Sequence, residues 1–525
     1  MRIDKAKPIR AQSRTLILAC VCLIAVAGIH CGGGEDRAYS RGSTITVLYP
    51  GDERILGPYQ EMPAKFLVFL PLVTHDENGE TVGQLATAWE HSSDYRRWTF
   101  HLRSDIRWHD GMPFTAHDIK FSLELFAHPD VLFDVPQSME SVTVLDDSTF
   151  TITFTKPMDA LDTWRVYYPK HLLEDLDPKE FWKWRFWTQP VGNGPYRYVR
   201  HVPQTMMEFE ANSDHYRGKP RIERVVLKFS GSASLVELTS GNVDVLTHVN
   251  RMDIPKLAAD PRFRVYSHIW PSVAWLEAIF WNQRNPLFQD RRVRRALTFA
   301  IDRGELRQIL NLPEDLVTAD VIFTAGQYWR GELPEPLLYR PQDSRRLLEE
   351  AGWHEAGVDG VREREGEEFS FTVIVPSEGA IAGASLMSAA IYVQSQFRHV
   401  GVHMEVQVLE SNLVRQRLRS GEFEAAFFRF FNAVAGHIQW FGKDSWIGYD
   451  NPRVAELLNA VQETSDLGEI DRIYRELFPI FLAELPVTFL FPQVTTTVTH
   501  RRVHGLSNPF WADPVSIMEH LWLEE

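Results

Sequence analysis

The alternation of apolar and polar residues predicts both strands and helices along this chain. Residues 98–103 (WTFHLR) and 403–409 (HMEVQVL) alternate from one residue to the next, as half-buried strands do. Apolar side chains on one face of a predicted helix are spaced three and four residues apart: Val293, Ala296, Leu297, Ala300 and Ile301. From about residue 43 onward no short repeat or low-complexity stretch interrupts this mixture. An α/β fold is therefore predicted.

Capping residues and glycines locate some of the predicted helices. Thr115 and Asp118 have the spacing of a capping box in front of residues 119–126. Gly401 ends a second predicted helix within residues 369–409, where a strand, a helix and another strand follow one another. Such a succession forms a right-handed βαβ unit, which implies a sheet covered by helices.

The N-terminal segment has the composition of a secretory signal peptide. Five basic residues precede an uninterrupted apolar run at residues 16–29, which is shorter than a bilayer-spanning helix. All three cysteines lie in or directly after this run, so the folded body has no disulfide or thiol chemistry. We expect residues 1–30 to be removed, Cys31 to be lipidated and residues 31–43 to form a flexible tether. Cleavage without lipidation and an uncleaved anchor remain the alternatives.

Composition and charge exclude two classes of protein. The 525 residues include 44% hydrophobic and 12% aromatic residues, which is too apolar for a disordered chain. Lys and Arg number 55 against 70 Asp and Glu, a formal net charge of −15. Because this charge repels phosphate backbones, nucleic acid is not expected as a partner.

No catalytic or cofactor signature is complete. The sequence HEAG at 354–357 lacks the second histidine, one turn later, that a zinc-protease helix requires. GNGPY at 192–196 lacks the third glycine of a dinucleotide-binding loop. DENGE at 76–80 is not followed by the bidentate glutamate of a calcium loop. We therefore expect a binding protein that is not an enzyme and that holds neither a metal nor a cofactor.

The order of several motifs carries a resemblance to a known family. The densest stretch of similarity is residues 71–124. Six shorter motifs follow it in order: YPKHLLE (168–174), VGNGPYRY (191–198), GNVDV (241–245), FQDRRVRRALTFAIDR (288–303), LLEEAGW (347–353) and FEAAFF (423–428). With these motifs in this order, residues 44 to about 505 resemble the family 5 extracellular solute-binding proteins, the oligopeptide, dipeptide and nickel type of receptor for ABC importers.

The resemblance implies a two-lobed periplasmic binding protein fold, of class II and cluster C type, with an extra subdomain inserted in the first lobe. Two strands would cross between the lobes, near residues 271–279 and 486–494. The implied boundaries are 44–64, 189–275 and 491–525 for lobe I, 65–188 for the inserted subdomain and 276–490 for lobe II.

The resemblance also implies a mechanism and partners. A peptide-like or other small solute bridges both lobes and shifts them toward the closed form, which a membrane permease recognises. Because the chain has no ATPase motif, the ATPase subunits are separate. The expected protein is a monomer in the periplasm or on the cell-envelope surface, held at the membrane by its lipid anchor. The alternative is an orphan receptor of the same fold that presents its ligand to a sensor or acts as an envelope chaperone.

The sequence departs from the peptide-binding members of this family at the implied ligand site. There the segment after the strand at 423–428 reads Gly-Trp-x-x-Asp, and the aspartate holds the amino terminus of the peptide. The aligned residues here are Arg429, Phe430, Phe431, Asn432 and Ala433. Since a buried ammonium without a counter-ion is costly, a solute with a carboxylate or phosphate fits this segment better.

Six residues form the predicted ligand site, in which the aromatic rings provide walls against the solute. They are Trp275, Arg429, Phe430, Phe431, Asn432 and Phe489. Three alternatives remain: the aromatic residues belong to the core, the alignment is shifted by one or two positions, or Arg429 points outward. In the last case, a neighbouring acid such as Glu424 or Asp444 would compensate the charge of the arginine.

Overall fold

The computed structural model describes most of the chain after its N-terminal segment. The described residues are 43–50, 64–76, 81–131, 138–161, 165–230, 234–269, 275–314, 316, 337–355, 360–377, 385–431, 434–442, 444–464, 466–492, 494–506 and 517–524. The predicted signal peptide, Cys31, nearly all of the predicted tether and Asn432 lie outside them. None of the helices within these ranges combines the length and apolar character that a membrane span needs.

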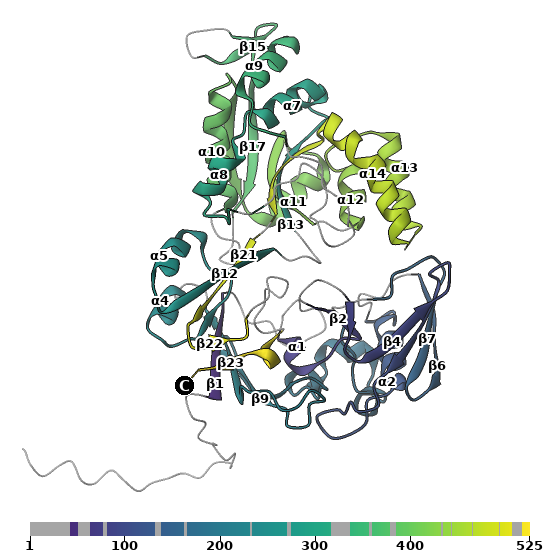
Figure 1. The fold of residues 1–525 in the computed structure, drawn as a ribbon. Coiled ribbons are helices and arrows are strands. Elements are labelled where there is room, and N and C mark those ends of the chain that lie inside the picture. Colours follow the sequence, from purple (N-terminus) through teal and green to yellow (C-terminus); the bar gives the residue numbers. More distant parts are fainter. Residues whose placement is uncertain are drawn as a thin grey trace, which may run out of the picture. The chain divides into compact units, whose positions relative to one another are not determined.

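A seven-stranded mixed sheet draws its strands from distant parts of the sequence (Figure 1). In sheet order its strands are β12 (Phe263–Ile269), β21 (Val494–His500), β11 (Val245–Leu246), β1 (Thr44–Pro50), β10 (Arg224–Ser230), β9 (Met206–Ala211) and β8 (Tyr196–Val202). The strand β1 runs parallel to both of its neighbours, β10 and β11. The chain therefore places strands on one side of β1 and then on the other.

A five-stranded sheet contains the predicted βαβ unit. In sheet order its strands are β18 (His403–Leu409), β17 (Ser370–Pro376), β19 (Ala425–Phe431), β13 (Trp275–Trp281) and β20 (Val487–Pro492). The helix α10 (Ser385–Arg398) connects β17 to the parallel strand β18, and α11 (Ser411–Ser420) leads from β18 to β19 on the other side of β17. The βαβ prediction is confirmed, with Gly401 at φ +82° after the helix.

A four-stranded antiparallel sheet lies in the segment predicted as an insertion. Its order is β4 (Ala86–His91), β5 (Arg97–Leu102), β7 (Thr149–Phe154) and β6 (Met139–Asp146), and α2 (Ala116–Phe126) packs against β6. Thr115 and Asp118 form the predicted capping box of α2. The aromatic side chains at positions 181, 184, 186 and 187 are buried in the same hydrophobic cluster as this sheet.

The chain passes twice between the two large sheets. It leaves the seven-stranded sheet after β12 and enters the five-stranded sheet at β13, and it returns between β20 and β21. The residues that join these strands, 270–274 and 493, lie outside the described ranges, so the two crossing strands near 271–279 and 486–494 stay a prediction. Residues 41–525 form one contact unit that contains both sheets.

One helix ends earlier than its apolar pattern predicts. The helix α7 (Arg291–Phe299) leaves Ala300 and Ile301 beyond its end, although both side chains are buried. The reason lies at Asp302, whose side chain accepts a hydrogen bond from the Glu305 N–H and caps a new helix, α8 (Arg303–Ile309). Burial therefore continues across a break in the helix.

Short elements complete the described fold. The remaining helices are α1 (Lys65–Val68), α3 (Lys170–Leu173), η2 (Pro178–Lys183), η3 (Arg185–Thr188), α4 (Ser234–Thr239), η4 (Arg251–Asp253), α5 (Ile254–Ala259), α6 (Pro286–Gln289), α9 (Pro341–Glu350), α12 (Val434–Phe441), α13 (Pro452–Gln462), α14 (Leu467–Glu484) and η5 (Met518–His520). The remaining strands are β2 (Val73–His75), β3 (Thr81–Gly83), β14 (His354–Glu355), β15 (Arg362–Arg364), β16 (Glu367–Glu368), β22 (Val503–His504) and β23 (Trp522–Leu523).

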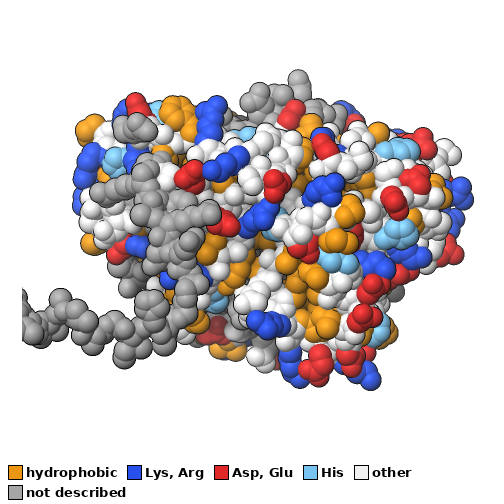
Figure 2. All heavy atoms as spheres, turned by 90° about the horizontal axis from the view of Figure 1, so that it is seen from below, with side chains coloured by type: hydrophobic (Ala, Val, Ile, Leu, Met, Phe, Trp, Pro, Cys, Tyr) orange, Lys and Arg blue, Asp and Glu red, His pale blue; other side chains and the backbone are white. Residues whose placement is uncertain are grey.

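The charged side chains on one face of the molecule are mixed in sign. Figure 2 shows Asp and Glu interspersed with Lys and Arg over that face, together with scattered apolar side chains. No continuous basic area is visible among the described residues on this face. It therefore lacks the basic stripe that a nucleic acid would need.

Candidate functional site

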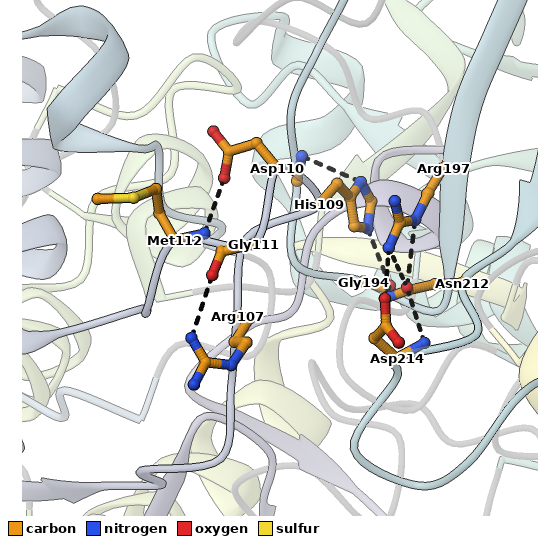
Figure 3. Close-up of polar contacts among 10 residues, drawn as sticks. Arg107, His109, Asp110, Gly111, Met112, Gly194, Arg197, Asn212 and Asp214 are labelled. Atoms are coloured by element: carbon orange, nitrogen blue, oxygen red, sulfur yellow. Dashed lines mark hydrogen bonds and ion pairs between the residues drawn. The ribbon is translucent and has the colours of Figure 1, made fainter.

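The motifs at 71–124 and 191–198 meet at His109 (Figure 3). The His109 N–H donates to the Gly192 carbonyl at 2.6 Å, and the Gly192 N–H donates to His109 Nδ1 at 3.2 Å. Because Nδ1 accepts this bond, Nε2 carries the ring proton and donates to the Gly194 carbonyl at 3.1 Å. Burial lowers the pKa of His109 to about 4, so the ring stays neutral. His109 thus joins the chain after β5 to the turn before β8.

The turn after His109 depends on a glycine. Gly111 has φ +91°, a conformation that favours glycine over other residues. The Met112 N–H donates to Asp110 Oδ1, and Arg107 Nη1 donates to the Gly111 carbonyl, each at 3.1 Å (Figure 3). His109 and the turn after it therefore hold two segments of the scaffold together.

Each large sheet has a topological switch point, where consecutive strands are added on opposite sides of one strand. In the seven-stranded sheet this strand is β1, between its parallel neighbours β10 and β11. In the five-stranded sheet it is β17, between β18 and β19. Open α/β sheets bind ligands beyond the carboxyl ends of their strands at such points. The candidate site therefore lies at the carboxyl ends of β1 and β11 in one sheet and of β17 and β19 in the other.

Most of the predicted site residues lie on two neighbouring strands. The strand β19 pairs antiparallel with β13, so the carboxyl end of β19 lies beside the start of β13. The paired residues there are Trp275 with Phe431, Leu276 with Phe430, and Glu277 with Arg429. The sequence prediction thus selected residues that the fold places next to one another at a switch-point edge.

Phe489 lies on the other strand that pairs with β13, opposite Ala278. It is on β20, its side chain is 4% exposed, and it packs in a hydrophobic cluster with Leu276, Ala278 and Phe280. Its carbonyl accepts a hydrogen bond from Arg303 Nε at 2.9 Å. The core interpretation therefore fits Phe489 in this structure better than the pocket-wall interpretation.

A buried carboxylate lies between two arginines at this edge. The Glu277 side chain is 1% exposed, and its Oε1 is 3.6 Å from Arg429 Nη2 and 3.9 Å from Arg251 Nη2. Arg429 and Arg251 are themselves mostly buried, with side chains 20% and 12% exposed. Since Arg251 belongs to η4, which follows β11, the contact joins the carboxyl edges of both large sheets. We call these three residues the arginine–glutamate cluster.

One acid that lies against Arg429 in the described part of the chain was not among those considered from the sequence. Glu424 is engaged elsewhere, because its carboxylate accepts hydrogen bonds from the Thr372 N–H at 2.7 Å and from Asn285 Nδ2 at 3.1 Å. Glu277 is the acid that lies against Arg429. The cluster therefore contains two guanidinium groups and one carboxylate, with a formal charge of +1.

Sequence reasoning missed Glu277, Arg251 and a third residue, His248. A signal for Glu277 exists in the sequence WLEAIFW (275–281), where one acid interrupts an apolar strand. A buried acid in such a position needs a cationic partner. Nothing local marks Arg251, because its partner lies on a different sheet. His248 has φ +52°, which cannot be recognised from its sequence neighbours.

The amino-acid sequence of this chain is similar to that of known solute-binding proteins. The family model described as bacterial extracellular solute-binding proteins, family 5 Middle, matches residues 80–441, more than half of the chain. A Brucella ovis protein whose name describes an ABC transporter peptide-binding protein is 31% identical over 295 residues, or 54% of this chain. The match covers 55% of that protein, so the chain spans about half the length of this curated relative.

Solved structures share the fold at lower identity. NikZ from Campylobacter jejuni, in complex with Ni(L-His), has a TM-score of 0.71 at 23% identity, over 92% of this chain and 99% of NikZ. The oligopeptide-binding protein AppA from Bacillus subtilis, in complex with a nonapeptide, has a TM-score of 0.69 at 19% identity, over 92% of this chain and 99% of AppA.

The fold is that of a two-lobed class II binding protein of mixed α/β content, as predicted. The chain belongs to the family 5 bacterial extracellular solute-binding proteins. Proteins of this solute-binding family are generally not enzymes. Because the family is extracellular, it implies a location outside the cytoplasm.

Proposed function

We propose that this protein is the substrate-binding component of an ABC importer and that it captures a small anionic solute. The observation that carries this proposal is the arginine–glutamate cluster at the edges where both sheets present their strand ends. Two guanidinium groups face one carboxylate there. A carboxylate or phosphate of the solute would accept charge-assisted hydrogen bonds from these guanidinium groups.

The position of the cluster also supports a role in lobe closure. Arg251 follows a strand of the seven-stranded sheet, whereas Arg429 lies on a strand of the five-stranded sheet. An anion bound by both arginines would connect the two sheets, so its affinity would be higher for the closed arrangement. Only such a difference in affinity shifts an open and closed equilibrium. A separate permease and ATPase would recognise the closed form and supply the energy for import.

The N-terminal segment supports the proposed location of the protein outside the cytoplasm. A basic stretch, a short apolar run and Cys31 followed by three glycines fit an exported lipoprotein. The protein would then bind its solute outside the cytoplasm, as a monomer tethered to a membrane, and deliver it without chemical change.

The proposal is tested by changing the charge of the cluster in both directions. Arg429→Gln removes one cation and should weaken anion binding by about tenfold to a hundredfold, as expected for a charge-assisted hydrogen bond. Glu277→Gln raises the formal charge of the cluster and should strengthen anion binding, although it destabilises the fold because the two arginines lose their counter-ion. Isothermal titration with a panel of carboxylates and sugar phosphates measures both effects.

A matched control is Arg472→Gln. This arginine is exposed on α14 and pairs with Glu469 at the surface. Its replacement should leave anion affinity unchanged. Equal anion affinities for the wild type, Arg429→Gln and Glu277→Gln would contradict the proposed anion site.

A further inference from the structure

His248 lies beside the arginine–glutamate cluster in the sequence and at a switch point in the fold. It comes directly after β11 and Thr247, three residues before Arg251. The neighbouring parallel strand β1 reaches its own carboxyl end at Tyr49 and Pro50. The ring centroids of His248 and Tyr49 are 6.0 Å apart. Both rings therefore stand at the strand ends where this class of sheet binds ligands.

The backbone at His248 is held in an unfavourable conformation. Its φ of +52° lies in the left-handed region, which costs conformational energy for any residue with a side chain. The residues on both sides are fixed: the Thr247 N–H donates to the Leu48 carbonyl at 3.2 Å, and the Val249 N–H donates to the Thr496 carbonyl at 2.9 Å. Strained backbone conformations that the surrounding structure holds in place cluster at functional sites.

The His248 ring has unused hydrogen-bonding capacity. Its Nδ1 is shielded from solvent and makes no hydrogen bond to the part of the chain that the structure describes. An unpaired buried N–H costs more than an unpaired lone pair, so the proton belongs on Nε2. The residue as a whole is only partly buried whereas Nδ1 is shielded, so we infer that the Nε2–H lies at the accessible edge of the ring. Burial also lowers the pKa of His248 to about 4, which keeps the ring neutral.

We propose that His248 is a second binding residue of the same site and that its Nε2–H donates a hydrogen bond to a hydroxyl oxygen of the solute. This inference rests on the proposed anion-binding function. A neutral imidazole suits an uncharged oxygen, since the anionic group is already matched by the arginines. A hydroxyl oxygen can accept this hydrogen bond through one of its lone pairs. The solute is thus a hydroxylated organic acid or a sugar phosphate.

The test uses two pairs of probes, which distinguish a carboxylate from a phosphate. D-Gluconate is compared with hexanoate, and D-glucose 6-phosphate with hexyl phosphate, by titration of the full-length chain. The variants are His248→Gly, His248→Asn and Arg429→Gln. Glycine and asparagine both tolerate a positive φ, so folding is preserved, and asparagine restores a hydrogen-bonding side chain.

We expect the wild type to bind the hydroxylated member of at least one pair more tightly than the alkyl member. His248→Gly should weaken the hydroxylated member about fivefold to tenfold and change the alkyl member by less than about twofold, with partial rescue by His248→Asn. Arg429→Gln should weaken both members of a pair, because it acts on the anionic group.

Three outcomes would overturn the inference. His248→Gly could bind the hydroxylated probe as tightly as the wild type, it could weaken both members of a pair equally, or the wild type could bind neither hydroxylated probe. The proposed function fails differently, through an Arg429→Gln variant that binds the anionic probes like the wild type. A melting temperature for His248→Gly at or above that of the wild type confirms that the change relieves strain and does not unfold the chain.

Discussion

At the scale of single residues, the chemistry of the site depends on partners that lie far apart in the sequence. The unusual arginine at position 429 is visible in the sequence because it stands near a position where peptide-binding relatives carry an aspartate. Its partner Glu277 lies on another strand, and the second cation, Arg251, lies beyond a different sheet. Sequence patterns report periodicity and local turns, so neither Glu277 nor Arg251 could be predicted as a partner of Arg429. The αL conformation of His248 was likewise invisible, because it arises from backbone bonds to Leu48 and Thr496.

His109 provides a pH-dependent test at this scale. A histidine titrates near pH 6.5 in the unfolded chain, whereas burial lowers the pKa of folded His109 to about 4. The folded state therefore binds fewer protons between these values. The stability that depends on neutral His109 is complete above pH 6.5 and is lost as the pH falls toward 4.

In urea unfolding at a series of pH values, the wild type should lose stability more steeply over this range than His109→Gln. The exposed His101→Gln is the control, and parallel pH profiles for wild type and His109→Gln would show that His109 is not a buried neutral ring.

At the scale of elements, the sequence predicted helix ends correctly where a capping residue or a glycine determines the backbone conformation. The capping box at Thr115 and Asp118 and the helix stop at Gly401 are both present. The end of α7 was missed, because Asp302 begins a new helix while the apolar pattern continues through Ala300 and Ile301. Burial and helical hydrogen bonding are separate requirements, and periodicity reports only the first.

Gly192 tests the turn that joins the two densest motifs. A Cβ atom at this position would lie 1.8 Å from the Val68 carbonyl oxygen of α1, so the backbone would have to move. Gly192→Ala should lower the free energy of unfolding by about 3 kcal/mol or more. The control is Gly304→Ala on α8, where the nearest atom is Asp302 Oδ1 at 3.2 Å; its effect should stay within about 1 kcal/mol, since alanine favours a helix. Similar denaturation midpoints for both variants would contradict this account of the turn.

At the scale of the whole molecule, the resemblance predicted the fold class and the family from ordered motifs, most of which are structural. The motifs at 71–124 and 191–198 are retained as scaffold contacts around His109, and they identify the fold without identifying the solute. The candidate site lies at the switch points of the two large sheets. On the proposed function, the nature of the solute depends on a few side chains at these edges, because proteins of one fold can carry different sites.

The most direct test of the central claim is native mass spectrometry of the exported chain before and after unfolding and refolding, which removes a bound solute. The account predicts a small mass bound in a one-to-one ratio and lost on refolding. That mass should be an organic acid or phosphate, and it should rebind to the wild type but not to Arg429→Gln. Recovery of a peptide that binds equally well to the wild type and to Arg429→Gln would contradict the account.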